Sequence, residues 1–202
     1  MPPGASPAAV QKFIGTHRQW IHRRVEDLST AAASDESRPT SIQLPAIGRH
    51  YAAEYEHAGE DAARVRVVGE SMLVVSGPLH NDRAIASLLR AWLAELAHRQ
   101  LAAQLAKVAE ECGLRYGRAQ VRRQRTRWGS CSASGTISLN VCLLFLRPQV
   151  VRYLLVHELC HTRHMNHSAK FWALVESFEP DYGALDQELL RGWQSVPGWM
   201  FS

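Results

Sequence analysis

Apolar residues recur every three or four positions in several stretches of the chain, which is the pattern of amphipathic helices. The first such stretch predicts a helix over about residues 6–28, with a proline suited to its first turn. A longer helix is predicted over residues 81–113, either unbroken or divided near His98. Its apolar stripe, which implies burial against another element, comprises Ile85, Leu88, Leu89, Trp92, Leu93 and Leu96.

Shorter segments rich in branched and aromatic residues indicate β-strands. In the last of them, Ile137 and Leu139 alternate with polar neighbours, as in a strand with one buried face. The stretch at residues 30–41 is rich in small polar residues and predicts a loop. The predicted strands are 51–56, 64–68, 72–75, 119–124 and 136–140, and a final helix is expected near 185–193. No internal repeat is visible.

The most informative pattern is the run HELCH at residues 157–161, which continues a predicted helix over residues 148–156. His157 and His161, four residues apart, lie on one helical face, so both imidazoles can reach a single metal ion. Glu158 lies beside them, where it can act on a metal-bound water. A third protein ligand would complete a catalytic zinc site that keeps one open position.

Three residues are candidates for the third ligand. His164 lies seven residues beyond His157, roughly 10 Å along a straight helix, so the three ligands would converge poorly. His167 follows Asn166, a residue that tolerates a left-handed conformation and could turn the chain back toward the metal. Glu176 is the remaining candidate, because some HExxH enzymes use a distant glutamate. We favour His167 and keep the other two as alternatives.

The spacing of the three histidines equals that of metzincins, in which glycine occupies the position of His164. That departure argues against a true metzincin. Beyond the histidines, Ser168 suits the N-cap of another helix. That helix would carry Phe171, Trp172 and Val175 inward.

Length and composition suit one globular domain, since 202 residues with 46% apolar content can bury a sizeable core. The first residues lack the apolar stretch of a signal peptide, and no run is long enough to span a membrane. The four cysteines show no CxxC spacing, which favours reduced thiols and a cytoplasmic protein. Cys160, inside the metal-binding run, is interpreted as a small packing residue.

Positive charge is concentrated between residues 113 and 170, where ten basic residues face one acidic residue. This segment therefore carries a formal charge of +9 within a whole-chain charge of +4. One interpretation is an ordinary solvated surface, and the other is a positive field that attracts acidic peptides, nucleotides or nucleic acid. Aromatic residues do not alternate with the basic ones, so base stacking is not indicated.

Several separated motifs together resemble the YgjP-like metallopeptidase family, a zincin-like group of metal-dependent hydrolases related to SprT-like proteins. The match is dense between residues 120 and 172 and looser elsewhere. The motifs are RTRWGSCS at 125–132, GTISLN at 135–140, HELCH at 157–161, Asn166-His167-Ser168 and Phe171-Trp172.

The resemblance implies that His157, His161 and His167 bind Zn²⁺ and that Glu158 is the general base. It also implies an α+β, zincin-like fold, in which a small, mainly antiparallel sheet packs on the HExxH helix beside additional long helices. We expect one domain over residues 1–202. Its N-terminal helical and hairpin part would span 1–112, and its metal-binding catalytic core 113–202.

Four further residues are candidates for substrate or oxyanion contact. Arg127 could pair with a carboxylate or steady a developing oxyanion, and Trp128 is either a core anchor or a substrate contact. His164 and Tyr182 are weaker candidates for the oxyanion role.

The function that these observations favour is a zinc peptidase acting on peptide or protein substrates. One alternative keeps the metal and changes the substrate to a nucleotide or phosphoanhydride, although no P-loop or paired carboxylate site is visible. Another is a nucleic-acid-associated protein, either with structural zinc or with SprT-like peptidase activity on DNA-bound proteins.

Overall fold

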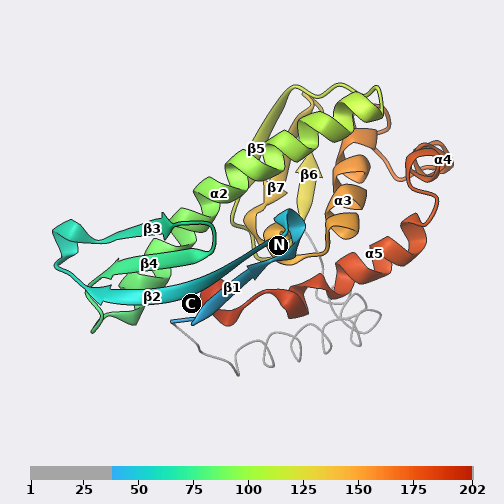
Figure 1. Ribbon diagram of the computed structural model, residues 1–202. Helices are drawn as coiled ribbons and strands as arrows, with labels where there is room; N and C mark the ends of the chain where they lie inside the picture. Colours follow the sequence, from blue (N-terminus) through green and yellow to red (C-terminus); the bar gives the residue numbers. More distant parts are fainter. Residues whose placement is uncertain (1–37, 202) are drawn as a thin grey trace, which may run out of the picture.

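Two small β-sheets and one long helix that runs past both form the framework of residues 38–201, the part of the chain that the computed structural model describes (Figure 1). The helix predicted over residues 6–28 and most of the predicted loop at 30–41 lie outside these residues. No helix in the described part is long and apolar enough to cross a membrane.

The first sheet contains four strands in the order β1-β2-β4-β3. Strands β1 and β2 are antiparallel, β2 and β4 are parallel, and β3 and β4 form an antiparallel hairpin. One-turn 3₁₀ helices follow β1 (η1, Pro45–Ile47) and β2 (η2, Glu60–Ala62). The strands are β1 (Ser41–Leu44), β2 (Arg49–His57), β3 (Arg64–Val68) and β4 (Met72–Gly77).

The second sheet contains three strands in the order β5-β7-β6. Strand β7 lies in the centre, parallel to β5 and antiparallel to β6. The turn between β6 and β7 places Gly135 at a φ of 73°, in the left-handed region that glycine adopts without strain. The strands are β5 (Arg118–Arg122), β6 (Gly129–Cys131) and β7 (Thr136–Asn140).

The expected mixture of helices and small sheets is confirmed, but the strands form two sheets instead of the single sheet expected. Three of the five strand pairs are antiparallel, and each sheet contains one parallel pair. The reason is that the second strand of each hairpin, β4 or β7, lies beside the strand that precedes the hairpin in sequence. Local alternation identifies strands, whereas their order depends on packing far along the chain.

Helix α2 (Asp82–Glu111) is one unbroken helix, which settles the question of a break near His98. It begins where the Asn81 side chain accepts a hydrogen bond from the Ala84 N–H, at 3.1 Å. Apolar residues along its whole length are buried, and Trp92 packs edge-on against Tyr51 with ring centroids 5.3 Å apart. The helix therefore links the two sheets through one hydrophobic core that extends from Ile42 to Met200.

The remaining helices follow β7, and α3, α4 and α5 lie together on one side of the molecule, on the right in Figure 1. The Asn140 side chain fixes the end of β7 by donating to the carbonyls of Gln124 and Arg127, at 2.8 and 2.7 Å. The chain then passes through η3 into α3, whose apolar residues are buried almost throughout. These elements are η3 (Val141–Phe145), α3 (Pro148–Cys160), α4 (Ala169–Phe178), α5 (Tyr182–Arg191), η4 (Gly192–Ser195) and η5 (Gly198–Met200).

Candidate metal centre

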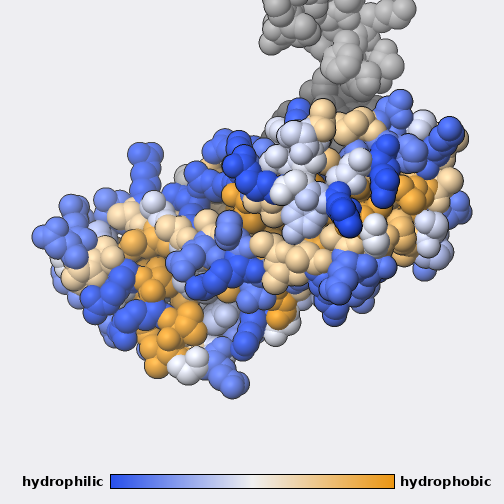
Figure 2. All heavy atoms as spheres, turned by 90° about the horizontal axis from the view of Figure 1, so that it is seen from above, coloured by the Kyte–Doolittle hydropathy of each residue, from blue (hydrophilic) through white to orange (hydrophobic). Residues whose placement is uncertain are grey.

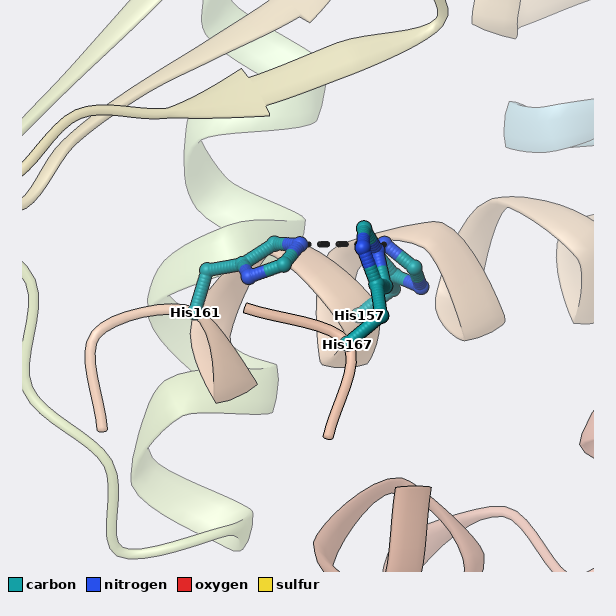
Figure 3. A group of neighbouring side chains, drawn as sticks. All are labelled: His157, His161 and His167. Atoms are coloured by element: carbon teal, nitrogen blue, oxygen red, sulfur yellow. Dashed lines mark hydrogen bonds between the residues drawn. The ribbon is translucent and has the colours of Figure 1, made fainter. Parts of the chain in front are cut away.

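Three imidazoles converge at the C-terminal end of α3 (Figure 3). His157 lies on the last turn of α3, His161 is its C-cap, and His167 comes shortly before α4. The Nε2 atom of His157 is 3.2 Å from Nε2 of His161 and 3.2 Å from Nε2 of His167. Among the described residues, these three are the group of His, Cys, Asp and Glu side chains whose ligand atoms all lie within 4.8 Å of one another.

These separations suit a tetrahedral zinc ion. Zinc binds imidazole nitrogen at about 2.0–2.1 Å, so two ligands at the tetrahedral angle lie roughly 3.4 Å apart. The observed 3.2 Å spacings are close to that value. The donor set therefore fits a zinc ion with three protein ligands.

Hydrogen bonds to the other ring nitrogens fix two tautomers. Nδ1 of His161 lies 3.1 Å from the carbonyl oxygen of His164, which can only accept, so Nδ1 carries the proton. The Tyr153 hydroxyl donates to Oδ1 of Asp186 at 2.8 Å, so at 3.4 Å it accepts from Nδ1 of His157. Both Nε2 atoms then present lone pairs to each other, an arrangement that a cation stabilises.

Burial keeps these imidazoles neutral. The pKa of His157 is lowered to about 3, first because the ring is buried and then because His161 and His167 are close. Burial also lowers the pKa of His161, partly offset by the hydrogen bond to the His164 carbonyl. A neutral imidazole is the form that binds a metal ion, so the rings are ready for coordination near neutral pH.

Glu158 is almost fully buried, with 4% of its surface exposed. Its Oε2 atom is buried and has no hydrogen-bond partner among the described residues, which is costly for a carboxylate unless another group completes the site. Burial raises the pKa of Glu158 to about 8. A nearby divalent cation would favour the ionised form of this carboxyl group.

Strand β6 packs directly against Glu158. A Cβ atom placed on Gly129, the first residue of β6, would lie 2.6 Å from Oε1 of Glu158. Any other residue at this position would therefore force either the strand or the carboxylate to move. Glycine allows the close approach that covers the carboxylate and removes it from water.

The segment between His161 and His167 turns without left-handed residues. No non-glycine residue described has a positive φ, so Asn166 does not adopt the left-handed conformation that it could have used to turn the chain. The chain reverses instead through a tight turn in which the Ser168 N–H donates to the Asn166 carbonyl at 2.9 Å. Ser168 is the N-cap of α4 as predicted, although its side chain makes no capping hydrogen bond.

The alternative ligands lie outside the histidine group. The side chains of His164 and Glu176 are not part of the set whose ligand atoms lie within 4.8 Å of one another. His164 contributes its backbone carbonyl, and Glu176 is exposed on α4. Cys160 is fully buried in the hydrophobic core, consistent with a packing role.

The other candidate residues occupy different surroundings. Trp128 is buried, with 7% of its surface exposed, and stacks on Trp193 at a centroid distance of 4.0 Å. Arg127 is exposed, and its carbonyl accepts from Asn140. Tyr182 stacks on Trp172, which in turn stacks on His167. Trp128 is thus a core anchor, and one ring, that of Trp172, separates Tyr182 from a metal-binding candidate.

Sequence reasoning missed Tyr153, Asp186 and the contact between Gly129 and Glu158. Tyr153 lies four residues before His157 and therefore on the same face of α3, which was an available signal. Asp186 is separated from Tyr153 by 33 positions, and no local pattern indicates that they meet.

Part of the positive charge of residues 113–170 is neutralised by the fold. Arg147 pairs with Glu188, and Arg152 pairs with Glu111 and Glu179, all outside that segment. Arg123 and Arg125 donate to backbone carbonyls near the C-terminus, those of Met200 and Phe201. Figure 2 shows hydrophilic residues spread over one face and interrupted by apolar patches. The basic segment is therefore not wholly a free cationic surface.

Comparisons with known proteins agree with the sequence motifs. Residues 1–191 match the family described as YgjP-like, metallopeptidase domain. No curated protein matches the chain.

Two solved structures show a limited likeness. The metallopeptidase zymogen abylysin of Pyrococcus abyssi is 24% identical, with a TM-score of 0.42, and the match covers 45% of this chain and 92% of that one. The zymogen jannalysin of Methanocaldococcus jannaschii is 14% identical, with a TM-score of 0.40, and the match covers 45% of this chain and 94% of that one. At TM-scores below 0.5 these likenesses assign neither fold nor function. The family match spans nearly the whole sequence, and the chain therefore belongs to the YgjP-like family of metallopeptidases.

Proposed function

We propose that this metallopeptidase is a zinc-dependent enzyme in which His157, His161 and His167 hold the metal. The observation that carries the proposal is the convergence of three Nε2 atoms at the end of the helix on which Glu158, the residue after His157, has a buried carboxylate oxygen without a hydrogen-bond partner in the described residues. Three imidazole nitrogens suit zinc, and a fourth position would remain for water or substrate. When bound, zinc polarises the scissile carbonyl and makes a coordinated water acidic near neutral pH.

Glu158 is the general base in this proposal. Its carboxylate accepts a proton as a water oxygen forms a bond to the carbonyl carbon of the substrate. The same carboxyl group then donates that proton to the leaving amine nitrogen as the C–N bond breaks. The buried position against Gly129 supports this role, because a carboxylate removed from water is more basic than an exposed one.

The zincin-like fold class and the organisation as one domain over residues 1–202 are part of the same proposal. The one-domain organisation is supported within residues 38–201 by a hydrophobic core whose members come from both sheets and from α2 to α5, and over residues 1–191 by the family match. The zincin-like class is supported by the histidine group at the end of α3. The N-terminal part, residues 1–112, and the catalytic part, residues 113–202, would then fold as one unit.

The test replaces Glu158 by glutamine, which keeps the size of the side chain and removes the base. We expect Glu158→Gln to retain zinc and to lower the rate of peptide cleavage by about 10²–10⁴-fold, the usual contribution of general acid–base catalysis. Casein and a mixed peptide library serve as substrates, with nucleoside triphosphates tested in parallel.

A matched control is Glu176→Gln, the same chemical change on the exposed face of α4. It should leave both zinc content and cleavage unchanged, which also tests the alternative third ligand. Full peptidase activity in Glu158→Gln would contradict the general-base role. Hydrolysis of nucleoside triphosphates without peptide cleavage would contradict the proposed substrate class.

A further inference from the structure

One face of α5 points toward the metal centre. Its inward residues are Tyr182, Leu185, Asp186 and Leu189, spaced as one helical stripe, and all four are at least partly buried. The helix packs against α3, which carries the histidines (Figure 1). Two residues of this stripe, Asp186 and Tyr182, each contact a side chain that in turn contacts one of the three histidines.

The first connection runs from Asp186 to His157. Asp186 accepts a hydrogen bond from the Tyr153 hydroxyl at 2.8 Å, and that hydroxyl lies 3.4 Å from Nδ1 of His157. A tyrosine hydroxyl has a single hydrogen, so its donation to Asp186 leaves its oxygen to accept from the imidazole. The chain of bonds therefore places the imidazole proton on Nδ1 and turns Nε2 toward the other two histidines.

The second connection runs from Tyr182 to His167. The Tyr182 ring stacks on Trp172 with centroids 5.3 Å apart and planes 20° apart. Trp172 stacks in turn on His167, with centroids 5.5 Å apart and planes 29° apart. This column restrains the orientation of an imidazole that lies on an exposed turn.

The third histidine needs no such support. Nδ1 of His161 is held by the backbone carbonyl of His164, within the same short segment. For His157 and His167, by contrast, no backbone carbonyl in the described residues holds the ring, and these are the two histidines connected to α5. Phe171 on α4 contacts all three rings, so what α5 adds is one further restraint each on His157 and His167, through Tyr153 and Trp172.

We propose that Asp186 and Tyr182 are positioning residues, and that α5 orients His157 and His167 before the metal binds. This inference rests on the proposed function and names the residues that set the affinity of the same site. Orienting the rings in advance removes the entropic cost of ordering them during binding.

The experiment measures the affinity of the purified full-length protein for zinc alone, by competition with a chromophoric chelator. We expect Asp186→Asn, which removes the negative charge behind the Tyr153 hydroxyl, and Tyr153→Phe, which removes the hydroxyl itself, each to weaken zinc binding by about 10–100-fold, the usual effect of altering an outer partner of a metal ligand. The double variant should bind zinc no more weakly than whichever single variant binds zinc less tightly, because both substitutions interrupt the same chain of hydrogen bonds.

Two matched controls separate positioning from general damage. Glu188→Gln makes the same carboxylate-to-amide change on α5, but Glu188 pairs with Arg147 away from the histidines, so zinc affinity should not change. Tyr182→Phe keeps the stacked ring and should keep the affinity, whereas Tyr182→Leu removes the ring and should weaken binding. Melting of each metal-free variant, followed by circular dichroism, identifies any that fail to fold.

The outcomes distinguish this inference from the proposed function. If the wild-type protein binds no zinc, the metal site itself is wrong. If it binds zinc and both Asp186→Asn and Tyr153→Phe bind equally well, the site stands and the role of α5 is wrong. If Tyr153→Phe fails to fold, Asp186→Asn carries the test, because Asp186 is only partly buried.

Discussion

Two parts of this molecule have the same strand arrangement, and only one of them carries the functional site. In the first sheet, β2 is followed by a hairpin whose second strand, β4, lies parallel to it, and in the second sheet β5, β6 and β7 repeat this arrangement. Each arrangement leads into a helix, α2 in the first case and α3 in the second. The strand order alone therefore does not create the site.

The difference lies in what covers the outer strand of each hairpin. Strand β3 remains open to solvent, with Val67 and Val68 exposed by 46% and 47%. Strand β6 instead packs against α3, where Gly129 meets Glu158. Because α3 covers the edge strand β6, the Glu158 carboxylate is buried between the two elements. This burial distinguishes the candidate catalytic centre from the first sheet, whose strands have the same arrangement.

The largest expected effect comes from removing one leucine from each central strand. Leu73 in β4 and Leu139 in β7 are both buried, and each is paired with both neighbouring strands. We expect Leu73→Ala and Leu139→Ala each to lower the free energy of unfolding by about 2–5 kcal/mol, because each leaves a cavity. Urea unfolding measures both losses.

The two leucine variants should differ in activity. Leu139 pairs with Gly129, so replacing Leu139 should loosen the strand that contacts Glu158. Leu73 pairs with Ala53 and Val67, which lie far from Glu158 in the sequence. Peptide cleavage per folded molecule should fall in Leu139→Ala and stay unchanged in Leu73→Ala. Equal peptide cleavage by the two variants would contradict the claim that only the second sheet supports the site.

A smaller change tests the contact between β6 and α3 directly. Gly129→Ala adds one carbon where only 2.6 Å separates it from Oε1 of Glu158, and the carboxylate must shift. A displacement of this size commonly costs about 10²-fold in rate, so we expect a loss of that order in kcat. The control Gly59→Ala has an ordinary φ of −64° and no atom within 4 Å of the added carbon. If Gly129→Ala cleaves peptides as fast as this control, the close approach has no catalytic role.

The smallest effect is expected on the open strand. Val67→Lys places a charge on the solvent-exposed part of β3, where it meets little packing. We expect the free energy of unfolding to change by no more than about 0.5 kcal/mol and peptide cleavage to remain unchanged. A large loss of activity would show that β3 takes part in the reaction after all.

Local spacing was enough to predict the helix that carries His157 and His161, because ligands four residues apart need only a helix to share a face. The choice of His167 also rested on local geometry, and the structure brings that ring to the others. Asn166 does not adopt the left-handed conformation that it could have used to turn the chain, because several backbone turns can reverse a short segment and the sequence does not select one.

The remaining features depend on residues far apart in the sequence. The central position of β7, the approach of Gly129 to Glu158 and the bond between Tyr153 and Asp186 all arise from packing between elements. The family motifs include the RWGSC segment, but only the structure shows that its glycine approaches the Glu158 carboxylate. Periodicity describes one element at a time and therefore cannot supply such contacts.

The proposed enzyme depends on one zinc ion held by His157, His161 and His167. The metal content of full-length protein purified without chelators, measured by mass spectrometry beside His167→Ala and the control His164→Ala, tests this directly. We expect one zinc per chain in the wild type and in His164→Ala, whose backbone carbonyl still holds His161, and a sharp loss in His167→Ala. Wild-type protein without stoichiometric zinc, or His167→Ala with undiminished zinc, would contradict this proposal.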